Sequence, residues 1–311
     1  MGRRSLDGLP GLRLEHAPFG HSEVSKDSGR DELRIWDFLT EERDLAMVWV
    51  LEKEGKCSHL IGSAHFFPYK FRRALKRLAR EARFMILEGP LELGDLREVA
   101  RKGMVGEEEG LSQFLDQATL ARLAKVMEHE GGLMGELIPG GLGLRPGKYG
   151  KLKLVLDGMR PWMAFFTLWV SHLERLGWIY HMDRDAFQIG SKMGCQVLHL
   201  ESLEEQLAAL EQIPRERILS FLKAVGQWKN YSRSYVRLYL QGDLKELLGL
   251  STGFPSRCKP VIDNRDRVLY QRMLPYLRVG GAVVLVGAPH TRAILEWLQG
   301  EGYKVRQVCI T

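Results

Sequence analysis

Residues 60–68 read LIGSAHFFP, and residues 283–290 read VVLVGAPH. In both stretches an apolar run reaches a glycine, and a histidine follows three residues later. Because glycine lets the backbone bend sharply, each stretch predicts a strand that ends in a Gly-x-x-His turn. A helical pattern follows each histidine, and another apolar run follows each helix. The sequence therefore predicts two βαβ units, with turn glycines and histidines at Gly62, Gly287, His65 and His290.

The two units predict an α/β fold in which a central sheet is built around them and surrounded by many helices. In open α/β sheets, ligands bind at the carboxyl ends of the strands. If the two strands are neighbours, both histidines project into one crevice. No repeat or low-complexity tract interrupts residues 34–311, which we expect to form a single domain. Residues 1–33 mix glycine, proline, serine and charge without periodicity, which predicts a mobile arm.

Composition narrows the class of protein. The chain has 311 residues, a formal net charge of +6 and four scattered cysteines without a CxxC pair. This pattern excludes a zinc ribbon and a disulfide framework and favours reduced thiols. No apolar core follows the basic N-terminus, and the stretch PWMAFFTLWVSHL is too short to span a membrane. We expect a cytoplasmic protein without a membrane span, whose oligomeric state stays open.

A basic stripe follows the first histidine. The stretch KFRRALKRLAREAR has an apolar helical face, and its other face carries arginine and lysine. No aromatic residues alternate with the charges, as they do where bases stack. We expect a solvated helix face over residues 70–83 and no nucleic-acid partner.

A carboxylate is expected beside the two histidines. Glu88 follows the apolar run FMIL, so it is expected at the same sheet edge as His65 and His290. A helix N-terminus behind each histidine favours a neutral imidazole, which suits a metal ligand. Two imidazoles and a carboxylate form a metal site with room for water. Glu88 can instead act as the base, and packing roles or a salt bridge to the basic helix stay open.

Four further residues are secondary candidates, each with a structural alternative. Asn264 can supply a hard oxygen ligand or cap a helix. Arg265 can bind a substrate carboxylate or an oxyanion, or pair with Asp263 or Asp266 on the surface. Asp183 is expected to cap a helix or support the site, and Glu201 is either a supporting or a structural residue.

These motifs resemble the TraB/PrgY/GumN family, which includes the Tiki proteins and is related to the EreA/ChaN-like fold. The resemblance covers roughly residues 34–311. Besides both Gly-x-x-His motifs and the strand-ending glutamate, four landmarks match in order: Pro161-Trp162, Met182-Asp183, Leu200-Glu201 with Glu205-Gln206, and Asn264-Arg265. Unlike the Tiki branch, with its signal and anchor, and other members with C-terminal membrane segments, this chain is expected to have neither feature.

The resemblance implies a metal-dependent hydrolase, foremost a peptidase, that uses manganese, cobalt or zinc on a peptide or small-molecule substrate. It implies that His65, Glu88, His290 and Asn264 are ligands and that Glu88 and Arg265 are catalytic. Two alternatives remain: a non-catalytic protein that binds haem or a regulatory peptide, and a metal-independent esterase of the EreA type. The sequence has no GxSxG elbow, which disfavours a Ser-His-Asp hydrolase.

Overall fold

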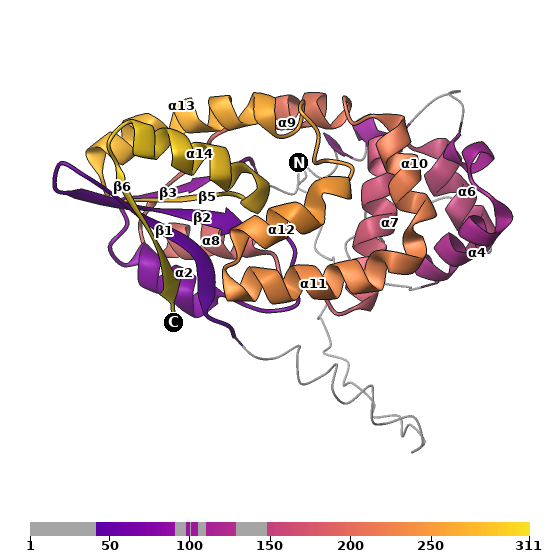
Figure 1. Cartoon of the computed structure of the whole chain (residues 1–311), viewed down its shortest axis with the longest axis horizontal. Coiled ribbons are helices and arrows are strands. Elements are labelled where there is room, and N and C mark those ends of the chain that lie inside the picture. The colour runs from indigo at the N-terminus through magenta and orange to yellow at the C-terminus, as the bar shows by residue number, and fades with distance from the viewer. Residues whose placement is uncertain (1–41, 91–97, 100, 105–109, 129–147) are drawn as a thin grey trace, which may run out of the picture.

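The computed structural model describes residues 42–90, 98–99, 101–104, 110–128 and 148–311. The expected arm and the first residues of the expected domain lie outside these ranges. The centre of the fold is a six-stranded sheet with the strand order β4-β3-β5-β2-β1-β6 (Figure 1). Its strands are β1 (Leu45–Lys53), β2 (Lys56–Ser63), β3 (Phe84–Leu87), β4 (Gln196–His199), β5 (Ala282–Gly287) and β6 (Lys304–Ile310).

The sheet is mostly parallel. β1 and β2 form an antiparallel hairpin whose turn has positive φ at Glu54 and Gly55. β2 and β3 each pair with β5 in parallel, and β4 pairs with β3 in parallel. β5 is buried along its whole length, as expected for an unbroken apolar strand between parallel neighbours. The prediction of an α/β fold with a central sheet surrounded by helices is confirmed.

Both expected βαβ units are present, although neither joins adjacent strands. The first runs through β2, α2 (Arg72–Ala79) and β3, and it skips the position that β5 fills. The second runs through β5, α14 (Ala288–Gly300) and β6, and it skips β2 and β1. β5 and β2 are direct neighbours, with Ser63 opposite Gly287. The carboxyl ends of the two motif strands therefore lie side by side.

The Gly-x-x-His turns are not confirmed. Gly62 lies inside β2, and Gly287 is the last residue of β5 and the N-cap of α14, with φ of −50°. Neither glycine has a positive φ, so neither is needed for backbone freedom. His290 lies in the first turn of a helix as expected, but His65 lies in a loop that precedes α2. The two histidines therefore reach the sheet edge by different local structures.

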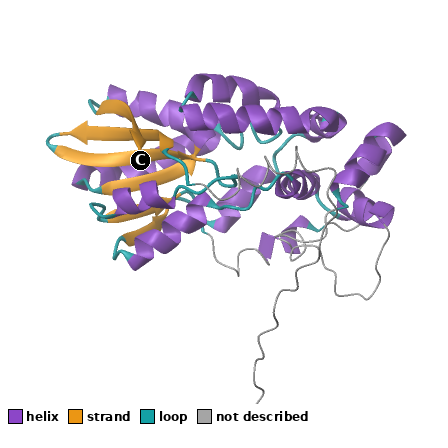
Figure 2. Cartoon of the chain, turned by 90° about the horizontal axis from the view of Figure 1, so that it is seen from below, coloured by secondary structure: helices purple, strands orange, loops and turns teal. Residues whose placement is uncertain are grey.

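Helices cover both faces of the sheet (Figure 1). α13 (Asp263–Val279) and α14 lie over one face, whereas α2 and α8 (Met182–Lys192) lie over the other. Figures 1 and 2 both show the strands gathered at one end and a strand-free helical part at the other. The remaining helices are α4 (Gln117–Val126), α6 (Lys148–Gly158), α7 (Pro161–Arg175), α9 (Leu203–Leu210), α10 (Arg215–Lys223), α11 (Trp228–Gln241) and α12 (Leu244–Leu250), with 3-10 helices η1 (Leu111–Phe114), η2 (Val225–Gln227) and η3 (Ser251–Gly253).

Two surface expectations can be compared with the fold. In the basic helix α2, Arg72 forms an ion pair with Asp185 of α8, so this arginine joins two helices and is not simply solvated. Arg73, Lys76 and Arg80 are exposed, as expected. Within the described ranges, no helix combines the length and the apolar character needed to cross a membrane.

Candidate functional site at the carboxyl edge of the sheet

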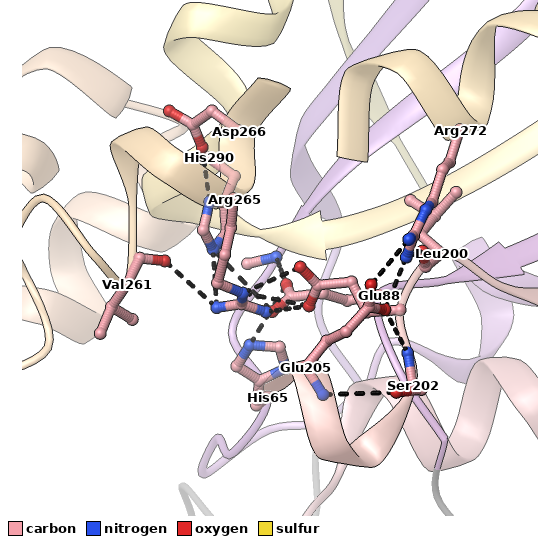
Figure 3. Close-up of polar contacts among 12 residues, drawn as sticks. His65, Glu88, Leu200, Ser202, Glu205, Val261, Arg265, Asp266, Arg272 and His290 are labelled. Atoms are coloured by element: carbon pink, nitrogen blue, oxygen red, sulfur yellow. Dashed lines mark hydrogen bonds and ion pairs between the residues drawn. The ribbon is translucent and has the colours of Figure 1, made fainter. Parts of the chain in front are cut away.

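Four neighbouring parallel strands each place a polar residue just beyond or at their carboxyl ends. In strand order these are Glu201 after β4, Glu88 after β3, His290 after β5 and His65 after β2. All but His65 are buried. Figure 3 labels His65, Glu88 and His290 of this group, together with Arg265 and Asp266, which come from α13. The parallel register therefore converts four distant sequence positions into one cluster.

His65 is held from the side of α8. Its Nδ1–H donates to Asp183 Oδ2 at 2.8 Å, and the hydroxyl of Ser63 donates to both Asp183 oxygens at 2.9 Å. Phe67 anchors the loop because it is fully buried and its backbone pairs with that of Tyr180 at 2.9 and 3.1 Å. These contacts leave His65 Nε2 directed towards Glu88, at 3.8 Å from Oε2. The side chain of His65 is still 58% exposed, so the cluster opens to solvent here.

His290 is held in the same manner from the opposite face of the sheet. Its Nδ1–H donates to Asp266 Oδ1 at 2.6 Å, and both side chains are buried. Its Nε2 lies 3.8 Å from Glu88 Oε1 and 3.5 Å from Arg265 Nη1. A carboxylate on Nδ1 fixes the tautomer that presents the Nε2 lone pair. Two Asp–His pairs therefore converge on Glu88 from the two sides.

Each carboxylate oxygen of Glu88 accepts a hydrogen bond. Oε1 accepts a hydrogen bond from Arg265 Nη2 at 2.5 Å, and Oε2 accepts one from the backbone N–H of Gly287 at 2.6 Å. The same guanidinium donates to Glu201 at 2.6 to 3.0 Å and to the carbonyl of Val261 at 3.3 Å. Arg265 therefore bridges two buried carboxylates instead of pairing with Asp263 or Asp266, as the surface alternative expected.

A second arginine supports the segment that carries Glu201. Arg272 donates to the carbonyl of Leu200 at 2.7 Å and to both oxygens of Glu205 (Figure 3). Glu205 also closes a capping box with Ser202 at the start of α9. The segment between β4 and α9 is thereby fixed at both ends of Glu201.

Gly287 keeps open a space between these side chains. A Cβ atom at this position would lie 3.1 Å from His65 Nε2, 3.3 Å from Glu88 Oε2 and 3.5 Å from His290 Cδ2. The three side chains therefore surround one point that any other residue would fill. Gly62 is crowded for a different reason, since its Cβ would meet Thr291 and Ala288 of α14 at 3.2 to 3.4 Å. Both glycines therefore allow neighbouring groups to pack closely against the backbone, and neither is needed to form a turn.

The charges of the cluster control its ionisation. Burial acts to raise the pKa of Glu88, but His290, Arg265 and His65 outweigh it and hold this pKa far below its ordinary value. Desolvation acts to lower the pKa of His65, but the carboxylates of Asp183 and Glu88 raise it to about 9. Burial also opposes the charge of Arg265, and its two glutamate partners raise its pKa further. Without a bound cation, the His65 ring is therefore protonated on both nitrogens and positively charged at neutral pH.

The substitution Asp183→Asn tests this account. Because it removes the main attractive charge, the pKa of His65 should fall below about 9, as an NMR titration of the imidazole would measure. The raised pKa stabilises the fold below pH 6.5, and this contribution is lost as the pH rises through about 9. The stability difference between wild type and variant should therefore shrink over that interval. Asp185→Asn, on the same helix, should leave the pKa of His65 unchanged.

A comparison of the chain with models of known protein families gives a match. The model of the TraB/PrgY/gumN family matches residues 47–307, nearly the whole described chain. The chain belongs to this family. No curated protein and no solved structure matches it. Every residue of the cluster lies within the range that matches the TraB/PrgY/gumN family.

For this member of the TraB/PrgY/gumN family, the sequence patterns missed two supporting residues. Asp266 was expected only as a surface partner of Arg265, yet it is buried and orients His290. Ser63, within the GSAH motif, carried no signal of its role. Asp183 does not cap α8, because that helix has His181 at its N-cap without a side-chain cap. Asn264 is exposed, and its side chain has no hydrogen bond with the described residues, so the structure does not bring it into the cluster.

The atom types of His65, Glu88 and His290 are suitable ligands for a divalent cation. Their side chains, however, lie farther apart than coordination of one ion requires. Two Nε2 atoms with carboxylate-bonded rings and one glutamate are suitable ligands, and the space beside Gly287 is bordered by His65 Nε2, Glu88 Oε2 and His290 Cδ2. Four carboxylates surround one arginine and two imidazoles, which gives an excess of negative charge. Among the described side chains, however, no three potential ligands are close enough to hold an ion as they lie. Binding would therefore draw His65, Glu88 and His290 inwards.

Proposed function

We propose that this protein is a metal-dependent hydrolase, with a peptide bond as its foremost substrate, in which His65, Glu88 and His290 hold one divalent cation. One observation carries the proposal: two Asp–His pairs direct their Nε2 atoms at one glutamate, each at 3.8 Å. A bound cation of this kind polarises a carbonyl oxygen and lowers the pKa of a water molecule.

The residues around the ligands have separate tasks. Asp183 and Asp266 keep protons on the Nδ1 atoms, so that both Nε2 lone pairs face the centre. His290, Arg265 and His65, with the N–H of Gly287, keep Glu88 ionised, ready to act as a ligand or to take a proton from water. Since Arg265 Nη1 lies near His290 Nε2, the guanidinium is also placed to donate to a developing oxyanion. Only His65 is substantially exposed, so substrate approaches from its side.

Calorimetric titration with manganese, cobalt and zinc tests the proposal. Wild type should bind one equivalent and release a proton, because His65 must lose its proton to become a ligand. His65→Ala, at an exposed position, should weaken binding by more than the roughly 10- to 100-fold that loss of an outer partner costs. His59→Gln, on the same strand β2 but away from the carboxyl edge, should bind as wild type does. Equal affinity in His65→Ala and wild type would contradict the ligand assignment.

Glu88→Gln separates the two roles of the glutamate. It keeps the shape of the side chain and removes its charge. Lost metal binding together with lost hydrolysis of a peptide library would identify Glu88 as a ligand. Retained metal binding with lost hydrolysis would identify it as the base. Retained hydrolysis would show that Glu88 has neither role.

A metal-free hydrolase is the second candidate, and one observation favours it. Both oxygens of Glu88 already have short hydrogen bonds, to Arg265 and to Gly287. In this reaction His65, held by Asp183, would act as the acid at neutral pH and as the base only above its pKa of about 9, and Arg265 would stabilise the oxyanion. Full hydrolytic activity after dialysis against a strong chelator, with no bound metal by elemental analysis, would favour this candidate over the first. If purified wild type neither binds metal nor hydrolyses any substrate, the binding-protein alternative would lead.

A further inference from the structure

A second recess lies in the strand-free helical part, away from the sheet. It is a pocket of about 350 Å³ between the ends of α4 and α7 and the start of α11. Its lining comprises Arg122, Lys125, Val126, His172, Arg175, Leu176, Val225, Gly226 and Lys229. We call it the basic pocket. None of its residues belongs to the cluster at the sheet edge.

Among the described residues, the lining of the basic pocket contains four cations and no carboxylate. Across the whole chain, 45 basic residues are nearly balanced by 39 acidic ones, so this local excess is not a consequence of composition. Within the described ranges, Arg122, Lys125 and Lys229 have no ion pair with an acidic side chain. Four exposed like charges around one recess create a positive local potential that attracts an anion.

Helix ends account for only part of this charge. Lys125 and Arg175 lie in the last turns of α4 and α7, where cations offset the helix dipole, and Arg175 donates to the carbonyl of Lys125. Arg122 lies earlier in α4, and Lys229 lies in the first turn of α11, where the helix dipole disfavours a cation. Arg122 and Lys229 therefore need another explanation.

His172 forms a fixed wall of the same lining. Its Nε2 is fully buried and has no hydrogen-bond partner among the described residues. The ring is fixed by stacking on Trp169 at 5.5 Å and by edge contact with Trp228 at 5.4 Å. Desolvation, together with Arg175 and Lys229, lowers the pKa of His172 to about 4, so the ring is neutral.

We propose that the basic pocket binds a small organic phosphate or polyphosphate. Its exposed cations are placed to receive an anion from solvent, and Val126, Leu176 and Val225 provide an apolar wall beside them. The volume lies at the lower end of the range for small-molecule pockets and exceeds what a single inorganic ion needs. Arginine and lysine are the usual partners of phosphate oxygens. This binding is separate from the proposed hydrolysis.

Calorimetry with pyrophosphate and with AMP, at constant ionic strength, tests the proposal on the full chain. Wild type should bind at least one of them and should unfold at a higher temperature in its presence. Arg122→Ala and Lys229→Ala should each weaken binding at least about 10-fold, because each removes a charged hydrogen bond. Lys223→Ala is the matched control, since this exposed lysine lies in the same helical part but outside the pocket.

The outcomes separate the possible sources of an effect. Tighter binding of AMP would identify an organic phosphate, and binding of pyrophosphate alone would identify a polyphosphate. The proposal is overturned if sodium chloride at the same ionic strength raises the unfolding temperature equally. It is also overturned if Arg122→Ala and Lys229→Ala bind both probes as wild type does. Because binding itself is measured, these results do not depend on hydrolytic activity.

Discussion

Gly287→Ala should weaken metal binding and hydrolysis at least about 10-fold, because the new methyl group would fill the space that the proposed ligands surround. The new methyl group would lie 3.1 Å from His65 Nε2 and 3.3 Å from Glu88 Oε2, in the space that the ligands surround. The backbone φ of −50° is accessible to alanine, so the fold itself should tolerate the change. Calorimetric metal titration and hydrolysis assays would measure the loss.

Gly300→Ala is the control for this prediction. Gly300 ends the same helix, and a Cβ there would meet no atom within 4 Å. Alanine has the higher helix propensity, so this variant should keep full activity and be slightly more stable. Unimpaired metal binding and hydrolysis in Gly287→Ala would show that the space between the histidines and Glu88 is not where the chemistry occurs.

Arg265→Gln should lower the free energy of unfolding by about 3–5 kcal/mol, because it leaves Glu88 and Glu201 buried beside each other without their shared cation. Arg272→Gln is the matched control. Arg272 also pairs with a glutamate, but its side chain and that of Glu205 are each 43% exposed, so the loss should stay near 1 kcal/mol or less. Urea denaturation of the three proteins would compare these values.

The pH dependence of Arg265→Gln gives a second check. The pKa of Glu88 is lowered in the fold, so its ionised form stabilises wild type above its ordinary value of about 4. That stabilisation is lost as the pH falls. In Arg265→Gln, protonation of Glu88 or Glu201 at low pH instead relieves the repulsion between these two carboxylates. The stability difference between wild type and Arg265→Gln should therefore narrow as the pH falls below about 5 and be largest at neutral pH. A constant difference would mean that Arg265 acts by packing alone.

Sequence patterns were sufficient for the sheet and for three residues at its edge. The apolar runs before Gly62, Glu88 and Gly287 are strands because they are buried on both faces, and this burial produces an unbroken apolar pattern. Since parallel strands align their carboxyl ends, the residue after each strand has a predictable place. That is why the sequence alone is enough to group His65, Glu88 and His290.

The supporting residues could not be predicted because they depend on how helices pack. Whether Asp266 or Asp263 faces the sheet is decided by the rotation of α13, and buried Asp266 contacts His290. Glu201 was ambiguous because β4 is short and only half-buried, with little apolar signal. The loop after His65 depends on Phe67, whose partners Trp178 and Tyr239 come from two other segments of the chain.

The place of β5 in the sheet has a consequence for folding. β5 separates β2 from β3, and its bond from Gly287 N–H to Glu88 joins residues 199 positions apart. Before β5 is synthesised, β2 and β3 each have an unpaired edge and cannot pair with each other in the native order. Insertion of this one strand both closes the two edges and brings His290 beside His65. A chain in which β5 has not yet inserted therefore has two open strand edges that favour aggregation, and the cluster at the carboxyl edge forms only when β5 takes its place.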